Sequence, residues 1–177
     1  LNDAQLQIVS DSLNEKYAID IDNDLFSPNA AYNHAVAGIG EENNGEHPEA
    51  SSSGMYLTAL SGLGVGDYVF ASHNNAVNNS SNFKTGSEVS AAGAEEAYNR
   101  IWYLQKVNAP TAQVAFDFDE ALEDGLNPTQ PGNYVLLYRS GTSGSFSKVK
   151  NADGIKNGDQ IYFDLTEAQI QDGYYTL

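Results

Sequence analysis

Three aspartates at alternate positions, Asp20, Asp22 and Asp24, are the part of the sequence that most resembles a metal-binding motif. In a calcium loop, carboxylates at positions one, three and five converge on a hard cation in this way. The remainder of the EF-hand pattern fails, because position six is Leu25 instead of glycine and position twelve is Ala31 instead of a bidentate glutamate. The triplet therefore indicates either a calcium site of another kind, with calcium as the one expected cofactor, or a solvated acidic turn.

A second polar group, His73, Asn74 and Asn75, follows the apolar run 67–72. Its imidazole and amides offer both donors and acceptors to sugar hydroxyls or to a metal. Asparagine is also common in turns. The segment is therefore either the rim of a ligand site or an ordinary surface loop, and the second interpretation is the simpler one.

The sequence gives less support for catalysis than for ligand binding. The histidines His34, His47 and His73 lie in separate segments, without the i, i+4 spacing of a helical zinc motif. No Gly-x-Ser-x-Gly elbow is present, and no spacing singles out a catalytic pair among the 24 acidic residues. Asp117, Asp119 and Asp164 fall on the expected outer faces of strands, where solvated carboxylates are common. We expect a protein that is not an enzyme and has no catalytic residues.

Composition limits the partners. Eight basic residues against 24 acidic ones give a formal net charge of -16, which repels nucleic acid and anionic lipid surfaces. No run of eighteen apolar residues is present, so we expect no membrane insertion. The chain has no cysteine, which excludes disulfides and thiolate chemistry. Because residue 1 is leucine, we expect a fragment or a processed product.

The elements that must position these groups are mostly strands. An apolar stripe at helical spacing predicts an amphipathic helix within residues 1–17, and we place the domain boundary after residue 19. Residues 20–177 carry short β-favouring runs separated by Gly, Pro and Asn turns, with period-two alternation after about residue 98. The expected fold is mainly β, an antiparallel β-sandwich with an N-terminal amphipathic helix.

The runs expected to form strands include 35–40, 55–60, 67–72, 98–105, 113–119, 134–139, 160–165 and 174–177. The run 134–139 is apolar on both sides and is expected to be central in its sheet. Thr166 to Gln169 has the spacing of a capping box and predicts one helical turn before the last strand.

The single tryptophan, Trp102, lies in the run 98–105, the densest β-favouring stretch of the chain. A lone tryptophan in an acidic domain is compatible with sugar stacking. Alternation puts Trp102 and Leu104 on one face and Ile101 and Tyr103 on the other, in a strand expected to be central. Trp102 is therefore predicted to anchor the core between two sheets.

Several segments together resemble a known arrangement in exported proteins. The first, 1–19, resembles the helix that closes a concanavalin A-like (LamG-type) domain in exported Bacteroidetes proteins. The segments 32–40, 100–102, 116–118 and 173–177 resemble the uncharacterised β-rich domain that follows it. The resemblance implies a large, multidomain, secreted or cell-surface protein, in many cases an adhesin or a substrate of type IX secretion, and it brings no catalytic residues.

Two functional hypotheses follow. One is a non-catalytic extracellular module that binds a polysaccharide or another cell-surface glycan, or mediates adhesion. The other is a structural spacer, stabilised by calcium if the aspartate triplet binds it, that positions neighbouring domains of the same polypeptide.

Overall fold

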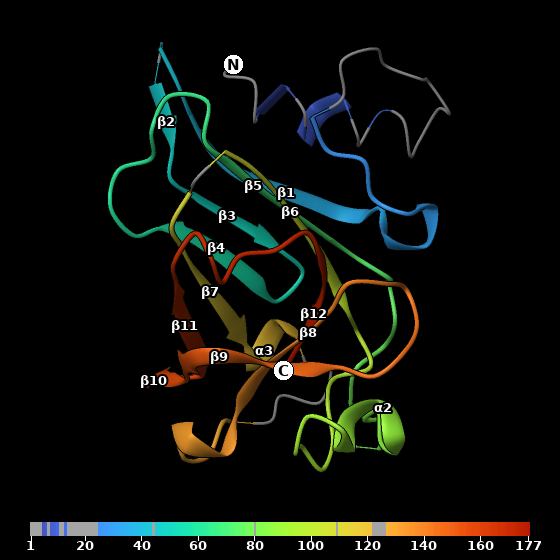
Figure 1. Ribbon diagram of the computed structural model, residues 1–177. Helices are drawn as coiled ribbons and strands as arrows, with labels where there is room; N and C mark the ends of the chain where they lie inside the picture. Colours follow the sequence, from blue (N-terminus) through green and yellow to red (C-terminus); the bar gives the residue numbers. More distant parts are fainter. Residues whose placement is uncertain are drawn as a thin grey trace.

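The computed structural model describes residues 5–6, 8–10, 13, 25–43, 45–79, 81–108, 110–121 and 127–177. Within these residues the chain forms two antiparallel sheets that pack face to face as a sandwich (Figure 1). The prediction of a mainly β, antiparallel sandwich is confirmed.

The larger sheet has seven strands in the order β2-β1-β5-β6-β12-β8-β9. Their bounds are β1 (His34–Glu42), β2 (Gly45–His47), β5 (Tyr68–His73), β6 (Trp102–Val107), β8 (Val135–Arg139), β9 (Ser147–Asp153) and β12 (Gly173–Thr176). The C-terminal strand β12 lies between β6 and β8, with Tyr175 opposite Trp102 on one side and Tyr138 on the other. The last residues of the chain are therefore held in the interior of this sheet.

The smaller sheet has five strands in the order β10-β11-β7-β4-β3. Their bounds are β3 (Glu49–Ser52), β4 (Met55–Ala59), β7 (Ala112–Asp117), β10 (Ile155–Asn157) and β11 (Gln160–Leu165). In β11 the side chains of Ile161, Phe163 and Leu165 are buried and alternate with more exposed ones, as the sequence alternation predicts.

The centre of the sandwich is a contact between the middle strands of the two sheets. Trp102 in β6 is fully buried and meets Phe116 in β7 edge to face, with ring centroids 5.4 Å apart. Its indole Nε1 donates a 2.7 Å hydrogen bond to the carbonyl oxygen of Ser52. The prediction that Trp102 is a core anchor in a central strand is confirmed.

Strand β8 corrects the expectation that the run 134–139 is central, because β8 is the sixth of seven strands. Both of its faces are nevertheless covered. Leu136 points into the core between the sheets, and Leu137 packs on the outer side with Val89 and Phe146. Val89 belongs to the short helix α2 (Ser87–Ser90), which therefore explains the apolar outer face of β8.

Asp117 also differs from expectation. It is only 8% exposed, and its Oδ1 accepts hydrogen bonds from the backbone N–H groups of Asp119 and Glu120. It thus caps the first turn of α3 (Phe118–Ala121), a helix in place of the expected end of a strand. Its Oδ2 accepts a bond from Gln160. Asp164 is exposed, as expected.

The other described helices are the 3-10 turns η1 (Ala30–Tyr32) and η2 (Pro131–Asn133). The predicted turn at Thr166 also forms, because the backbone N–H of Thr166 donates to the Gln169 side chain at 2.9 Å and the Gln169 N–H donates to the Thr166 carbonyl at 2.9 Å.

The expected N-terminal helix is not confirmed. Of residues 1–17, only 5–6, 8–10 and 13 are described; these have helical backbone, and the rest lie outside the described residues. Three of the apolar stripe residues, Leu6, Val9 and Leu13, are 41–46% exposed and do not pack on the sandwich as a core face would. The boundary proposed after residue 19 also lies outside the described residues. Among the residues that are described, no helix is long and apolar enough to cross a bilayer.

Candidate ligand-binding site

The predicted polar group, His73 to Asn75, begins at the last residue of β5. His73 is 2% exposed, with its ring 6.1 Å from that of His34 and 6.2 Å from that of Trp102. Its Nδ1 accepts a 2.9 Å hydrogen bond from the backbone N–H of Asn75, so the proton of the neutral ring is on Nε2. Nε2 has no hydrogen-bond partner among the described residues.

Burial, with smaller contributions from the nearby Arg100 and His34, lowers the pKa of His73 to about 4. The ring is therefore neutral near pH 7.

Asn74 uses its side chain within the protein. Its Oδ1 accepts hydrogen bonds from the backbone N–H groups of Ile101 and Ala76, and its Nδ2 donates to the carbonyl of Asn99. Asn75 takes a left-handed backbone conformation, with φ at 53°, which asparagine tolerates well. The structure therefore brings His73, Asn74 and Asn75 together, and in it the imidazole Nδ1 and the Asn74 amide hold the loop and the start of β6 in place.

The aspartate triplet, Asp20, Asp22 and Asp24, lies outside the described residues. Among the residues that are described, no group of three or more histidine, aspartate or glutamate side chains is arranged to hold a metal ion.

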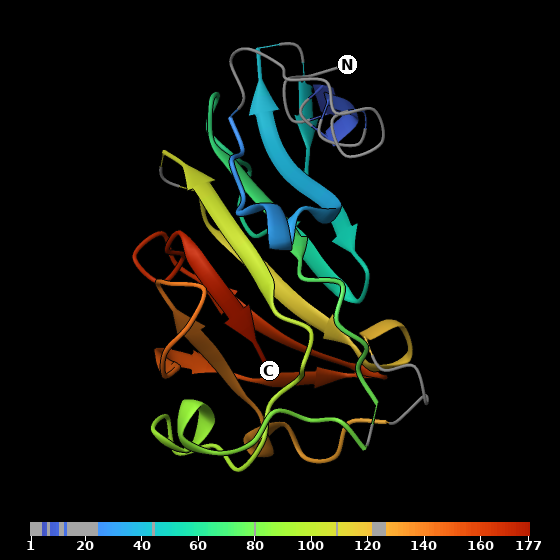
Figure 2. The same cartoon turned by 90° about the vertical axis from the view of Figure 1, so that its right-hand side faces the viewer.

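The end of the sandwich that carries α2 lies opposite the end formed by β2 (Figures 1 and 2). Residues that follow α2 and residues of η2 contribute to the lining of a cleft of about 670 Å³. This volume is within the range of about 300–1,000 Å³ usual for small-molecule sites. Four aromatic side chains line it: Phe83, Tyr98, Phe118 and Tyr134. Tyr98 and Phe118 are each 4% exposed, while Phe83 and Tyr134 are half-buried. Five exposed polar residues also line it: Glu95, Glu96, Asn127, Thr129 and Asn133.

The four rings contact one another in series. Phe83 stacks on Tyr98 with centroids 5.9 Å apart, Tyr98 meets Phe118 edge to face at 5.7 Å, and Phe118 meets Tyr134 edge to face at 5.4 Å. The Tyr134 hydroxyl is held by the backbone N–H of Thr129 at 2.9 Å. The four rings thus form one continuous series, and a hydrogen bond to Thr129 holds Tyr134 at one end of that series.

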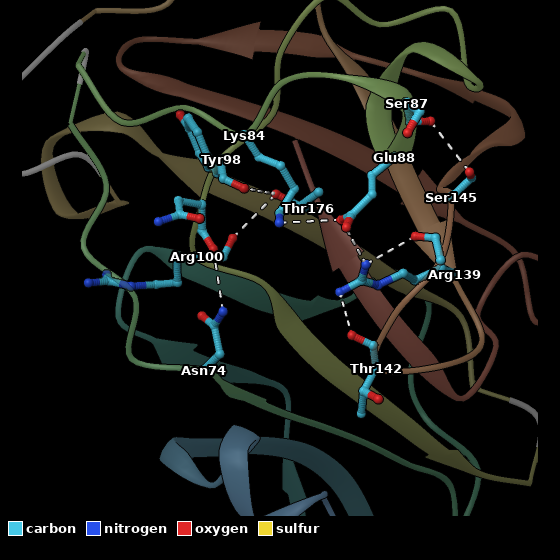
Figure 3. A network of polar contacts seen from close by, with 12 residues as sticks. Asn74, Lys84, Ser87, Glu88, Tyr98, Arg100, Arg139, Thr142, Ser145 and Thr176 are labelled. Carbon is cyan, nitrogen blue, oxygen red and sulfur yellow. Dashed lines mark hydrogen bonds and ion pairs between the residues drawn. The ribbon is translucent and has the colours of Figure 1, made fainter.

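Backbone bonds hold the segment that carries Tyr98. Lys84 and Ala97 exchange two backbone hydrogen bonds of 2.8 and 2.9 Å, and the Tyr98 N–H donates to the carbonyl of Leu177 at 2.8 Å. The Thr176 hydroxyl lies 3.1 Å from the Tyr98 carbonyl, to which it donates (Figure 3). The lining of the cleft is therefore attached to the C-terminal strand on one side and to the Phe83 segment on the other.

A charged network supports α2 beside the cleft. Glu88 lies 3.3 Å from the Lys84 ammonium and 3.2 Å from the guanidinium of Arg139 (Figure 3). Arg139 also donates to the Thr142 carbonyl and lies 4.4 Å from the centroid of the Phe146 ring. The cations next to the cleft are thus occupied by Glu88 and by the protein backbone.

Three polar groups of the cleft have no partner among the described residues. The Tyr98 hydroxyl is buried and has no hydrogen-bond partner among the described residues. Burial, with smaller contributions from Tyr134 and Asp117, raises the Tyr98 pKa, so the hydroxyl stays protonated. Glu95 and Glu96 make no ion pair with any described residue, and no Lys, Arg or His is among the described residues of the lining.

This arrangement supports binding by contact and hydrogen bonding. Aromatic faces can cover the apolar face of a ligand, while a buried hydroxyl, two carboxylates and two amides supply polar contacts. Sequence reasoning did not find the cleft, because its aromatic residues come from four separate segments. The one available signal is that each stands beside a turn or an irregular segment, where side chains reach the end of a sandwich instead of its core.

Comparison with known proteins places the chain in one family. Neither the curated proteins nor the solved structures gave a match. A family model described as "Domain of unknown function (DUF8202)" matches residues 12–173 and so covers most of the chain, including every strand except β12, of which it reaches only the first residue. The chain therefore belongs to the DUF8202 family.

Proposed function

We propose that this domain is a non-catalytic binding module of a secreted or cell-surface protein, and that the cleft at its α2 end binds carbohydrate. The observation that carries the proposal is the aromatic lining of the cleft together with the free hydroxyl of Tyr98 at its buried side. Aromatic rings pack on the apolar faces of sugars, and ring–ligand contact of this kind needs little reorganisation when the rings are already held in place.

The buried hydroxyl of Tyr98 also supports the proposal that the cleft binds a sugar. A buried hydroxyl without a partner costs about 1–3 kcal/mol relative to one that is hydrogen-bonded. A sugar hydroxyl that reaches it would recover that bond. The amides of Asn127 and Asn133 stand at the exposed side of the cleft, where they can act as both donors and acceptors.

The extracellular setting rests on the resemblance to the β-rich domain that follows LamG-type domains in exported proteins. A strongly acidic surface, with a net charge of -16, and the lack of cysteine agree with such a setting. Neighbouring domains of the same polypeptide are then the expected structural partners.

The test is a glycan array followed by affinity gels containing soluble polysaccharides. Three variants are compared with the wild type: Tyr134→Ala and Tyr98→Phe in the cleft, and Tyr162→Ala on β11 as a control for loss of a tyrosine outside it. We expect wild type and Tyr162→Ala to bind and Tyr134→Ala to lose at least about tenfold in affinity, as a lost aromatic contact typically does. Thermal melts confirm that each variant is folded.

Failure to bind any glycan would overturn the carbohydrate proposal and leave the spacer hypothesis. Repeating the melts after EDTA and again with added calcium tests the aspartate triplet, because a ligand that binds only the folded state raises the melting temperature. An unchanged melting temperature would show that calcium does not bind to the folded domain.

A further inference from the structure

The charges around the cleft restrict the ligand further. Glu95 and Glu96 are both exposed, both line the cleft, and neither is paired with a cation among the described residues. Glu88, a few residues earlier, is the contrasting case, because it is neutralised by Lys84 and Arg139. Two adjacent carboxylates are thus left without a counter-charge beside four aromatic rings.

Each of these groups favours a cation. The face of an aromatic ring is electrostatically negative and attracts an ammonium group, and carboxylates attract it directly. The lining offers no Lys, Arg or His to receive a carboxylate, sulfate or phosphate, again counting the described residues only. The net charge of -16 raises the cost of bringing an anion to this surface.

We propose that the cleft selects sugars that carry a protonated amine, such as oligomers of β-linked glucosamine, over neutral and anionic sugars. This inference rests on the proposed function, since it names the class of sugar that the same cleft takes. The ammonium group lies between the aromatic lining and the carboxylates of Glu95 and Glu96, and the hydroxyl groups of the sugar meet the Tyr98 hydroxyl and the amides at the rim.

The acidic pair alone would not define a ligand site. The independent observation is Tyr98, a residue of the same lining that is only 4% exposed and whose buried hydroxyl has no partner in the described part of the chain. The carboxylates of Glu95 and Glu96 favour a ligand with a positive charge, and the hydroxyl of Tyr98 favours a ligand with hydroxyl groups. An amino sugar has both.

The experiment compares three oligomers of the same length and linkage that differ only at the second ring carbon. Glucosamine oligomers carry an ammonium group there, N-acetylglucosamine oligomers an acetamide, and cello-oligosaccharides a hydroxyl. Affinities are measured by calorimetry at about pH 5.5, where carboxylates are ionised and sugar amines are protonated. We expect the glucosamine oligomer to bind about tenfold more tightly than the cello-oligosaccharide, and this advantage to shrink in high salt.

The double variant E95Q/E96Q should lose this advantage, so that it binds the glucosamine oligomer and the cello-oligosaccharide with similar affinity. The control E49Q/E167Q removes the same charge outside the cleft and should keep the advantage. Equal affinity for the three oligomers, tighter binding of a uronic acid oligomer, or an advantage that persists in E95Q/E96Q would overturn this inference while carbohydrate binding stands. Binding of no oligomer and no glycan on the array would overturn the proposed function itself.

Discussion

The loop after β5 and the cleft at the α2 end are both rich in polar groups, yet the two regions use them in opposite ways. In the loop, His73 and Asn74 bind backbone N–H groups, and the buried Asn78 accepts from the Arg100 N–H at 2.6 Å. In the cleft, the Tyr98 hydroxyl and two glutamates have no partner among the described residues. Residue type thus states what a side chain could bind, while its partners in the fold decide whether it is available.

The largest effect is expected at the core residue beneath the loop. Trp102→Ala removes a fully buried ring that contacts Phe116 and His73 and donates to the Ser52 carbonyl. We expect it to lower the free energy of unfolding by about 3–5 kcal/mol, or to prevent folding. Urea denaturation followed by circular dichroism measures the loss. A variant of wild-type stability that merely failed to bind glycans would contradict the role of Trp102 as a core anchor.

Two asparagines of the same segment separate buried from exposed amides. Asn78 donates to the Ala121 carbonyl and accepts from Arg100, and both bonds are buried. Asn82 makes two bonds as well: the bond with Asn79 is partly buried and the bond with Val77 is exposed. We expect Asn78→Ala to cost about 2–3 kcal/mol and Asn82→Ala less than about 1 kcal/mol, because water replaces the partner only at the exposed site. Equal losses in urea denaturation would refute the distinction.

The neutral state of His73 makes stability depend on pH. Its pKa is about 4 in the folded protein and 6.5 when exposed, so the unfolded chain binds more protons between these values. The stabilisation that comes from the neutral His73 ring is fully present above about pH 6.5. The free energy of unfolding falls by on the order of 2 kcal/mol as the pH is lowered towards 4. His73→Asn keeps an acceptor for the Asn75 N–H but cannot titrate. Urea denaturation at several pH values should show a smaller decrease for this variant than for wild type, and identical decreases would argue against a buried neutral His73.

The smallest effect is expected at Tyr98, and Tyr175 is its control. Both side chains are buried and burial raises the pKa of both, but the Tyr175 hydroxyl accepts from the Gln171 N–H at 2.8 Å and donates to the Gln171 carbonyl at 2.9 Å. Tyr175→Phe should cost about 1–2 kcal/mol, whereas Tyr98→Phe should cost nothing and should raise stability by about 1 kcal/mol, because it removes a buried hydroxyl that has no partner among the described residues. A large loss of stability in Tyr98→Phe would reveal a structural partner for its hydroxyl and would remove it from the site.

The strands were the most predictable part of the molecule, for reasons visible at particular residues. Alternation at Ile161, Phe163 and Leu165 reports one buried face, and the density of β-favouring residues around Trp102 marks a central strand. The rank of β8 in its sheet was not predictable. Its outer face is apolar because α2 covers it, and a pattern that reports burial cannot tell whether a neighbouring strand or a distant helix provides it.

Local pattern and composition were enough to predict the mainly β fold, the core role of Trp102 and the turn at Thr166, and composition fixes the net charge of -16. Tertiary structure decided which polar groups are available. It places Asp117 at the start of a helix and uses the Asn74 amide on backbone groups, and it gathers Phe83, Tyr98, Phe118 and Tyr134 from four segments into one cleft. Such groupings depend on contacts between residues far apart in the chain, and no local pattern records those contacts.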